Sequence, residues 1–151
     1  VDLSPAPARV PPPVVGEYLL AVALSRVDQM HNMQGDPSSI PSDVANLYGQ
    51  PVKDSGNDKA PLALMRMVTD GPDHPSTTQM RIIESYVRGL DVPAELVWGM
   101  QDPILARGLE PMRAMLPNAA VTETSAGHFL QEEVPEEIAA AIIRVFNRAT
   151  Q

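Results

Sequence analysis

The chain has 151 residues, enough for one domain with a hydrophobic core of ordinary size. Its 19 acidic and 11 basic residues give a net charge of −8, which argues against nucleic acid or an anionic membrane as a partner, because both require a basic surface. The absence of cysteine excludes disulfides, thiolate metal sites and a cysteine nucleophile. No apolar run approaches a membrane span and no charged-then-apolar leader opens the chain, so we expect a soluble, cytoplasmic protein.

The beginning of the chain is dominated by proline. Residues 1–13 are expected to form the end of a strand and a linker, because prolines remove backbone donors and disfavour helix in the residue before them. Residues 14–30 then carry valine and leucine at helical spacing. We therefore predict an amphipathic helix over 14–30 that enters a second, irregular region.

This irregular region alternates short helices with polar loops. A loop is expected over 31–42, then a short helix from Pro41 to Tyr48 that stops at Gly49. A further helix is expected over 61–69, with Pro61 in its first turn. Such a segment suits a lid better than a core, and we interpret 14–75 as a helical cap region.

Residues 76–151 have the regular alternation of an α/β domain. An apolar stripe predicts a helix from Ser76 to about Gly89, and a proline suited to a first helical turn predicts a last helix from Pro135. Between them we predict a strand over 94–98, a helix over 111–116 and a strand over 119–124. The order α-β-α-β-α indicates part of a parallel, helix-flanked sheet. Two strands alone do not make such a sheet stable, so we expect it to be completed by something outside this chain.

Both predicted strands end by presenting a polar side chain. Asp102 follows the first strand and Gly99, and His128 follows the second strand and Gly127. Parallel strands joined by a helix bring these two loops to the same edge of the sheet, where α/β folds place their sites. A carboxylate and an imidazole brought together there are the acid and base of a catalytic triad. The alternatives are a turn-forming aspartate before Pro103 and a loop histidine bonded to backbone.

Three stretches of the sequence carry a family resemblance: LVWGMQDPIL at 96–105, GHFLQEEVPEEIA at 127–139 and RMVTDGPDHPS at 66–76. With them the chain resembles the C-terminal half of an α/β-hydrolase and is most like the haloalkane dehalogenases. The third stretch resembles the end of that family's helical cap. The resemblance covers most of 60–148 and is weak over 1–59. It implies the C-terminal part of an α/β-hydrolase core over 76–151.

The resemblance also assigns roles to individual residues. Asp102 matches the triad acid and His128 the triad base, while four apolar residues match positions beside the pocket. It implies hydrolysis of a carbon–halogen bond in a small apolar organic substrate, without a metal or organic cofactor. The positions beside the pocket are Ile104, Leu105, Phe129 and Leu130.

The family's nucleophile has no counterpart in this sequence. It stands on an elbow of the G-x-[SD]-x-G kind, and no two glycines here frame such a motif. We therefore expect a companion N-terminal half, on the same precursor or as a second polypeptide, to carry an Asp nucleophile. A Ser nucleophile would give an esterase or lactonase, and an epoxide hydrolase also uses this scaffold. The alternative of another class is a catalytically silent, hydrolase-like binding or structural subunit.

Other conspicuous side chains are interpreted as structural. Trp98 lies inside a strand and is expected to pack rather than to bind halide, and His74 is expected to support the start of a helix. The three histidines are too dispersed for metal-ligand spacing. The glutamates near the last helix are expected to favour its N-terminus through the helix dipole. These are Glu132, Glu133, Glu136 and Glu137.

Overall fold

The computed structural model describes residues 27–56, 63–64, 66–69 and 71–150. The predicted strand end and linker over 1–13 and most of the helix over 14–30 lie outside the described residues. The described residues within 1–30 and 41–83 form one compact unit, and those within 31–40 and 84–151 form a second unit. The second unit therefore joins residues 31–40 to the C-terminal part of the chain, and the division at residue 75 stays a prediction.

In the first unit, helix α2 (Ser42–Asp54) is longer than the sequence predicted. It passes through Gly49 and carries Pro51 inside it. An amide–carboxylate bond of 2.6 Å between Gln50 and Asp54 supports this added part. The helix ends before Gly56, whose φ of 64° is the left-handed conformation that favours glycine. The local glycine signal at Gly49 therefore placed the end of this helix too early.

The first unit also contains the approach to helix α4 (Thr77–Arg88). The helix predicted over 61–69 falls partly outside the described residues, of which 63 and 64 are helical. His74 Nδ1 accepts a hydrogen bond from the Ser76 backbone N–H at 3.1 Å, and its Nε2 lies 3.0 Å from the Arg66 carbonyl oxygen. This bonding confirms the prediction that His74 supports the start of a helix.

The second unit contains a two-stranded parallel sheet, as predicted. Strand β1 (Glu95–Gly99) pairs with β2 (Ala120–Thr124) in the register Glu95 to Ala120 and Gly99 to Thr124. Between them run a short 3-10 turn, η3 (Ala106–Gly108), and helix α5 (Leu109–Met115). After β2 come the short helix α6 (Leu130–Glu133) and helix α7 (Pro135–Ala149). This order confirms an α/β arrangement.

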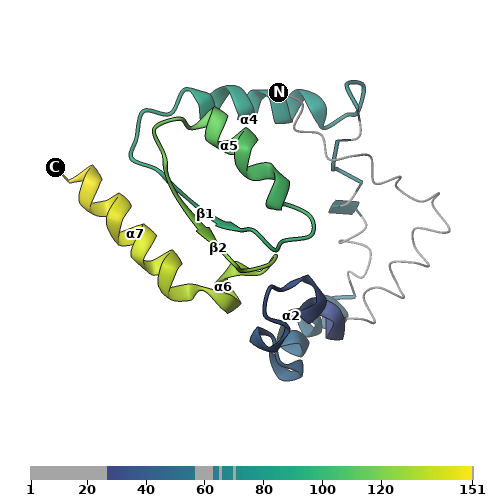
Figure 1. The fold of residues 1–151 in the computed structure, drawn as a ribbon. Helices are drawn as coiled ribbons and strands as arrows, with labels where there is room; N and C mark the ends of the chain where they lie inside the picture. Colours follow the sequence, from purple (N-terminus) through teal and green to yellow (C-terminus); the bar gives the residue numbers. More distant parts are fainter. Residues whose placement is uncertain (1–26, 57–62, 65, 70, 151) are drawn as a thin grey trace. The chain divides into compact units, whose positions relative to one another are not determined.

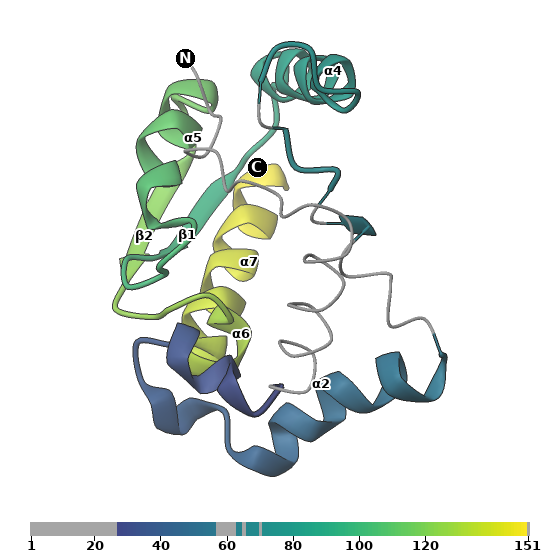
Figure 2. The same ribbon diagram turned by 90° about the vertical axis from the view of Figure 1, so that its right-hand side faces the viewer.

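Helices cover both faces of the strand pair. In Figures 1 and 2, α5 lies on one side of β1 and β2 and α7 lies on the other. Buried apolar side chains come from the strand, from both helices and from the loop after β2. They are Leu96, Leu109, Met115, Ala126 and Ala141. Other apolar side chains of α7 stay open, with Ile142, Ile143 and Phe146 each at least 60% exposed.

A carboxylate on β1 joins the sheet to α7. The Glu95 side chain is 2% exposed and forms ion pairs with Arg144 and Arg148, the latter at 3.2 Å. The Thr122 hydroxyl on β2 donates to the same carboxylate at 3.0 Å. Hydrogen bonding from Arg144 lowers the pKa of Glu95 to about 2 in spite of its burial. The ionised carboxylate is therefore a fixed part of this interface.

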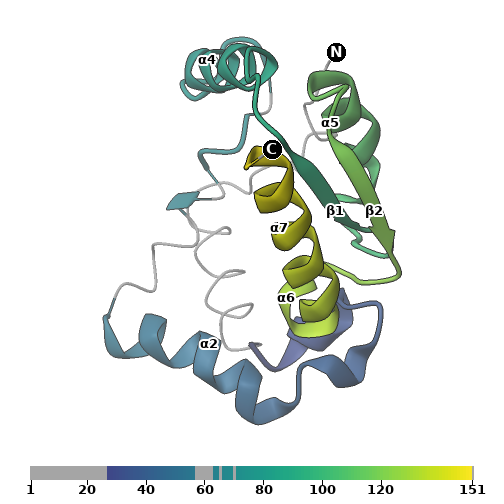
Figure 3. The same ribbon diagram turned by 90° about the vertical axis from the view of Figure 1, so that its left-hand side faces the viewer.

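Residues 31–40 differ most from their prediction as a plain loop. They include the end of the 3-10 helix η1 (Val27–Met33) and the 3-10 turn η2 (Pro37–Ser39). Gln34 and Ile40 are buried. In Figure 3 this purple segment lies beside α6. In the ranges that the structure describes, no helix is long and apolar enough to cross a membrane.

Candidate active site

The candidate site lies where β1 and β2 end. The two segments that follow the strands continue side by side. The Met100 N–H donates to the Thr124 carbonyl at 2.9 Å and the Gln101 N–H to the Ala126 carbonyl at 3.0 Å. A side chain at Gly99 would prevent this approach, since a Cβ there would lie 2.5 Å from the Gly127 carbonyl oxygen. The glycine that ends β1 thus brings the Asp102 loop against the His128 loop.

The Asp102 carboxylate is held by its own loop. One oxygen, Oδ1, accepts the backbone N–H groups of Ile104 at 2.7 Å and Leu105 at 3.0 Å. Burial raises the pKa of Asp102, but these two hydrogen bonds and the contact with His128 outweigh it, so the pKa lies below its ordinary value. Asp102 is therefore a turn-forming residue, and its second oxygen, Oδ2, remains available for another partner.

That partner is the His128 imidazole. His128 Nδ1 lies 2.9 Å from Asp102 Oδ2, and the two side chains are 26% and 4% exposed respectively. Because Asp102 is ionised, the tautomer that fits this contact carries its proton on Nδ1 and donates it to the carboxylate. Nε2, the other ring nitrogen, forms no hydrogen bond within the described part of the chain. A neutral imidazole held in this way presents a basic nitrogen opposite the carboxylate.

The four residues predicted to line a substrate pocket do not share one environment. Ile104 and Leu105 follow Asp102 and are 48% and 52% exposed. Phe129 meets the His128 ring edge-on, with ring centres 5.1 Å apart. Leu130 lies elsewhere, in a groove of about 430 Å³ between β1 and α7. Their substrate-binding role stays a prediction.

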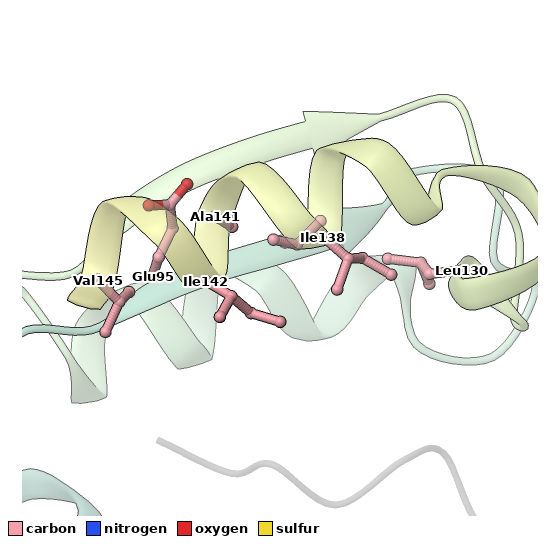
Figure 4. A pocket seen from close by; sticks show the side chains of 7 residues that line it. Glu95, Leu130, Ile138, Ala141, Ile142 and Val145 are labelled. Atoms are coloured by element: carbon pink, nitrogen blue, oxygen red, sulfur yellow. The ribbon is translucent and has the colours of Figure 1, made fainter. Parts of the chain in front are cut away.

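This groove is apolar and separate from the acid–base pair. Figure 4 shows Ile138, Ile142 and Val145 leaving α7 on one side, in line with Leu130. Val97 and Glu95 contribute from β1, and neither Asp102 nor His128 lines the groove. The groove therefore belongs to the face of the sheet beside α7 and not to the edge that carries Asp102 and His128.

Two polar residues that support the His128 loop were missed by sequence reasoning. Gln34 contacts Phe129 from 95 positions away. Glu133, interpreted as a helix-dipole residue, instead accepts backbone N–H groups of Gly35, Asp36 and Gly127. That interpretation is wrong for Glu133, because its carboxylate turns to another segment. No local sequence pattern indicates a hydrogen-bond partner so distant in sequence.

Trp98 has the packing role that the sequence predicted. Its indole N–H donates to the carbonyl oxygens of Leu105 at 3.1 Å and Ala106 at 3.2 Å. The ring therefore ties β1 to the loop that carries Asp102. In the ranges described here, no group of three or more histidine, cysteine, aspartate or glutamate side chains is arranged to hold a metal ion.

Comparison with known proteins finds similarity at low identity. The chain is 28% identical over 112 residues to a haloalkane dehalogenase from Mycobacterium marinum (strain ATCC BAA-535 / M), a match that covers 72% of this chain. The matched part spans 38% of the length of that relative. No family model matches the chain. The similarity and the parallel strand pair support a distant relationship to the α/β-hydrolases.

Proposed function

We propose that this chain supplies the acid and the base of an α/β-hydrolase, most like a haloalkane dehalogenase. The observation that carries the proposal is the 2.9 Å contact between Asp102 Oδ2 and His128 Nδ1 at the carboxyl ends of two paired parallel strands. Binding sites of open α/β sheets lie at this edge. The similarity to a haloalkane dehalogenase supports carbon–halogen hydrolysis as the proposed reaction within the hydrolases.

In the proposed reaction, Asp102 acts through His128. The carboxylate accepts the Nδ1 proton, fixes the tautomer and stabilises the imidazolium that forms. A nucleophilic carboxylate first displaces halide from carbon and leaves an alkyl ester on the enzyme. His128 Nε2 then takes a proton from water, whose oxygen attacks the ester carbonyl. The imidazolium returns that proton to the departing alkoxide oxygen, which releases the alcohol, and the regenerated carboxyl group loses the second water proton to solvent, where it balances the halide. Asp102 remains ionised throughout, in agreement with its lowered pKa.

The proposal requires a companion N-terminal half that carries the nucleophile, on the same precursor or as a second polypeptide. The sequence has no G-x-[SD]-x-G elbow. A two-stranded parallel pair needs further strands beside its edges to be stable, and the exposed apolar side of α7 is suited to cover such strands. The groove beside β1 adds to this apolar surface. These features support a sheet that is extended by another segment.

A small apolar organic substrate fits the side chains next to the pair. Ile104 and Leu105 are half exposed directly after Asp102, and the Phe129 ring lies against the imidazole. These side chains offer an apolar surface and no charge to bind the substrate. We propose that they contact the alkyl part of the substrate once the site is complete.

The proposal is tested on the longest native polypeptide that contains this chain, together with any second polypeptide that copurifies with it, hereafter the native polypeptide. Purified protein is assayed for halide release from 1-bromobutane, hydrolysis of p-nitrophenyl butyrate and opening of styrene oxide. His128→Gln is expected to lower turnover about 10³-fold, within the range of a general base. His74→Gln is the matched control, because it also removes a hydrogen-bonded imidazole but leaves the Asp102 partner in place.

The three substrates distinguish the alternatives. Halide release that depends on His128 supports the dehalogenase assignment. Ester or epoxide turnover in its place, again lost in His128→Gln, assigns an esterase or an epoxide hydrolase. Absence of all three activities, or activity unchanged by His128→Gln, overturns the catalytic proposal and favours a binding or structural subunit.

A further inference from the structure

A segment from the first third of the chain lies directly on the loop that carries His128. The His128 backbone N–H donates to the Met33 carbonyl oxygen at 2.8 Å. The approach is as close as a glycine allows, because a Cβ on Gly127 would lie 2.1 Å from that same oxygen. Figures 2 and 3 both show the purple segment beside α6, which follows the His128 loop.

Gln34 is the centre of this contact. Its side chain is almost fully buried, with the residue 8% exposed. Its Oε1 accepts the Phe129 N–H at 2.8 Å, and its Nε2 donates to the Phe129 carbonyl at 3.1 Å. The same Nε2 also contacts the Ser39 hydroxyl at 3.2 Å. One amide therefore pairs with both backbone groups of the residue next to His128, as a neighbouring strand would.

Glu133 fixes the two segments to each other from the other side. Its carboxylate accepts the Gly127 N–H at 2.6 Å, immediately before His128. It also accepts the Asp36 N–H at 2.5 Å and the Gly35 N–H at 3.2 Å, immediately after Gln34. Hydrogen bonds to an ionised acceptor are stronger than those between neutral groups. Glu133 thus locks Gln34 in register with the His128 loop.

These bonds determine where the imidazole can lie. The backbone is held at Gly127 by Glu133, at His128 by Met33 and at Phe129 by Gln34. The His128 side chain departs from the middle of this fixed stretch and reaches Asp102 Oδ2 at 2.9 Å. A small rotation of the Phe129 peptide would move both His128 and the Phe129 ring that lies against it.

We infer that Gln34 is a positioning residue that holds the His128 imidazole in contact with Asp102. The inference about geometry stands on the contacts above, and its consequence for turnover rests on the proposed hydrolase function. Gln34 lies in the sequence region that we interpret as a cap. A segment of that region would therefore take a direct part in orienting the base. Gln34 itself does not contact the reacting atoms.

The test replaces Gln34 by methionine, which has a similar length but cannot pair with Phe129. Gln34→Glu keeps an acceptor for the Phe129 N–H and loses the donor, so its effects should be intermediate. Gln79→Met on the exposed side of α4 is the matched control. All are made in the native polypeptide. Long-range ¹H–¹⁵N NMR of the histidine rings reports the tautomer of His128 and the exchange of its Nδ1–H.

We expect Gln34→Met to weaken the Nδ1–H signal of His128 and mix its two tautomers. Turnover should fall on the order of tenfold to a hundredfold, mostly in kcat, because small misplacements of reacting groups have effects of this size. Gln79→Met should match the wild type in both measurements. If Gln34→Met does not fold, Gln34→Glu carries the same comparison.

The NMR measurement separates this inference from the proposed function. If the native polypeptide hydrolyses none of the substrates, the proposed function fails, but a disturbed His128 tautomer in Gln34→Met still supports positioning. If Gln34→Met only lowers the unfolding temperature and leaves the His128 signals and turnover unchanged, Gln34 has a merely structural role. That result would overturn the inference.

Discussion

The two loops that form the candidate site are supported in opposite ways. The Asp102 loop is held by bonds from within the same stretch: the N–H groups of Ile104 and Leu105 and the indole of Trp98. The His128 loop is held by residues nearly a hundred positions earlier, with Gln34 bonded to Phe129 across 95 residues. Glu133, which also supports this loop, is close to it in sequence.

This difference separates a loop that its own residues can shape from one that depends on the rest of the fold. The two N–H groups that bond Asp102 Oδ1 lie two and three residues away along the chain, whereas the bond from Asp102 Oδ2 to His128 spans 26 residues. The contacts of the His128 loop require residues 31–40 to return and dock, which adds the entropy of closing a long loop. We expect the Asp102 loop to tolerate change elsewhere in the chain and the His128 loop to be sensitive to it.

Asp102→Asn breaks the connection between the loops while leaving both in place, and it should have the largest effect. The amide oxygen can still accept the Ile104 and Leu105 N–H groups, so the amide NH₂ faces His128 Nδ1 and forces the wrong tautomer. Hydrolase turnover should fall about 10⁴-fold. Steady-state kinetics measure this, with the exposed Asp91→Asn as control. Near wild-type turnover would contradict the role of Asp102.

Gly127→Ala should perturb the His128 loop and leave the Asp102 loop unchanged. The new methyl group would overlap the Met33 carbonyl and the Gln34 backbone, which lie 2.1 and 2.5 Å from the Cβ position. We expect a loss of about 1–3 kcal/mol in the free energy of unfolding, as for other overpacking substitutions. Chemical denaturation measures it, and Gly71→Ala is the control because nothing lies within 4 Å of its Cβ position. Equal stability of the two variants would mean that residues 33–36 do not dock as described.

Glu95→Gln weakens the contact between α7 and the strands that carry both loops. This contact lies at the ends of the strands far from the site. The substitution replaces a carboxylate bound by Arg144 and Arg148 and should destabilise the protein by about 1.5–3 kcal/mol, as for hydrogen bonds to charged groups. The pKa of Glu95 falls from an ordinary 4.5 to about 2 on folding. Its stabilisation is therefore complete above pH 4.5 and is lost as the pH falls toward 2.

The pH dependence gives a second measurement of the same ion pairs. Between pH 4.5 and 2 the wild type should lose its extra free energy of unfolding over Glu95→Gln. The unfolding free energies of the two proteins should therefore converge. Glu136→Gln, at an exposed position of α7, is the matched control, because it also removes one carboxylate but leaves Arg144 and Arg148 bonded to Glu95. A constant gap between wild type and Glu95→Gln over this range would rule out the ion pairs as its cause.

Trp98→Phe weakens only the Asp102 loop and should have the smallest effect. It removes one indole N–H shared between the Leu105 and Ala106 carbonyls and keeps most of the ring. A loss of about 1 kcal/mol in unfolding free energy is expected. Hydrogen exchange should rise at Ile104 and Leu105 and stay unchanged at His128 and Phe129. Equal changes in both loops would contradict their separate support.

Predictions from the sequence succeeded where neighbours along the chain decide the structure. The strands at 95–99 and 120–124, their parallel pairing and the helix from Pro135 follow from β-forming runs, a connecting helix and a proline at a first helical turn. The end of α2 was misplaced at Gly49, because a bond between Gln50 and Asp54 and a later left-handed glycine extend the helix. Gly49 is only a weak signal for a helix end, and the bond and the turn that follow it outweigh that signal.

The sequence by itself determined that a carboxylate and an imidazole follow two strands, since the residues and the α-β alternation are written in order along the chain. Only the tertiary structure decided that Gln34 and Glu133 hold the imidazole loop and that Glu95 joins the sheet to α7. The physical reason is that a buried amide or carboxylate takes whichever donors and acceptors the fold brings to it. Nothing in the spacing of residues 34 and 129 identifies them as partners before the chain has folded.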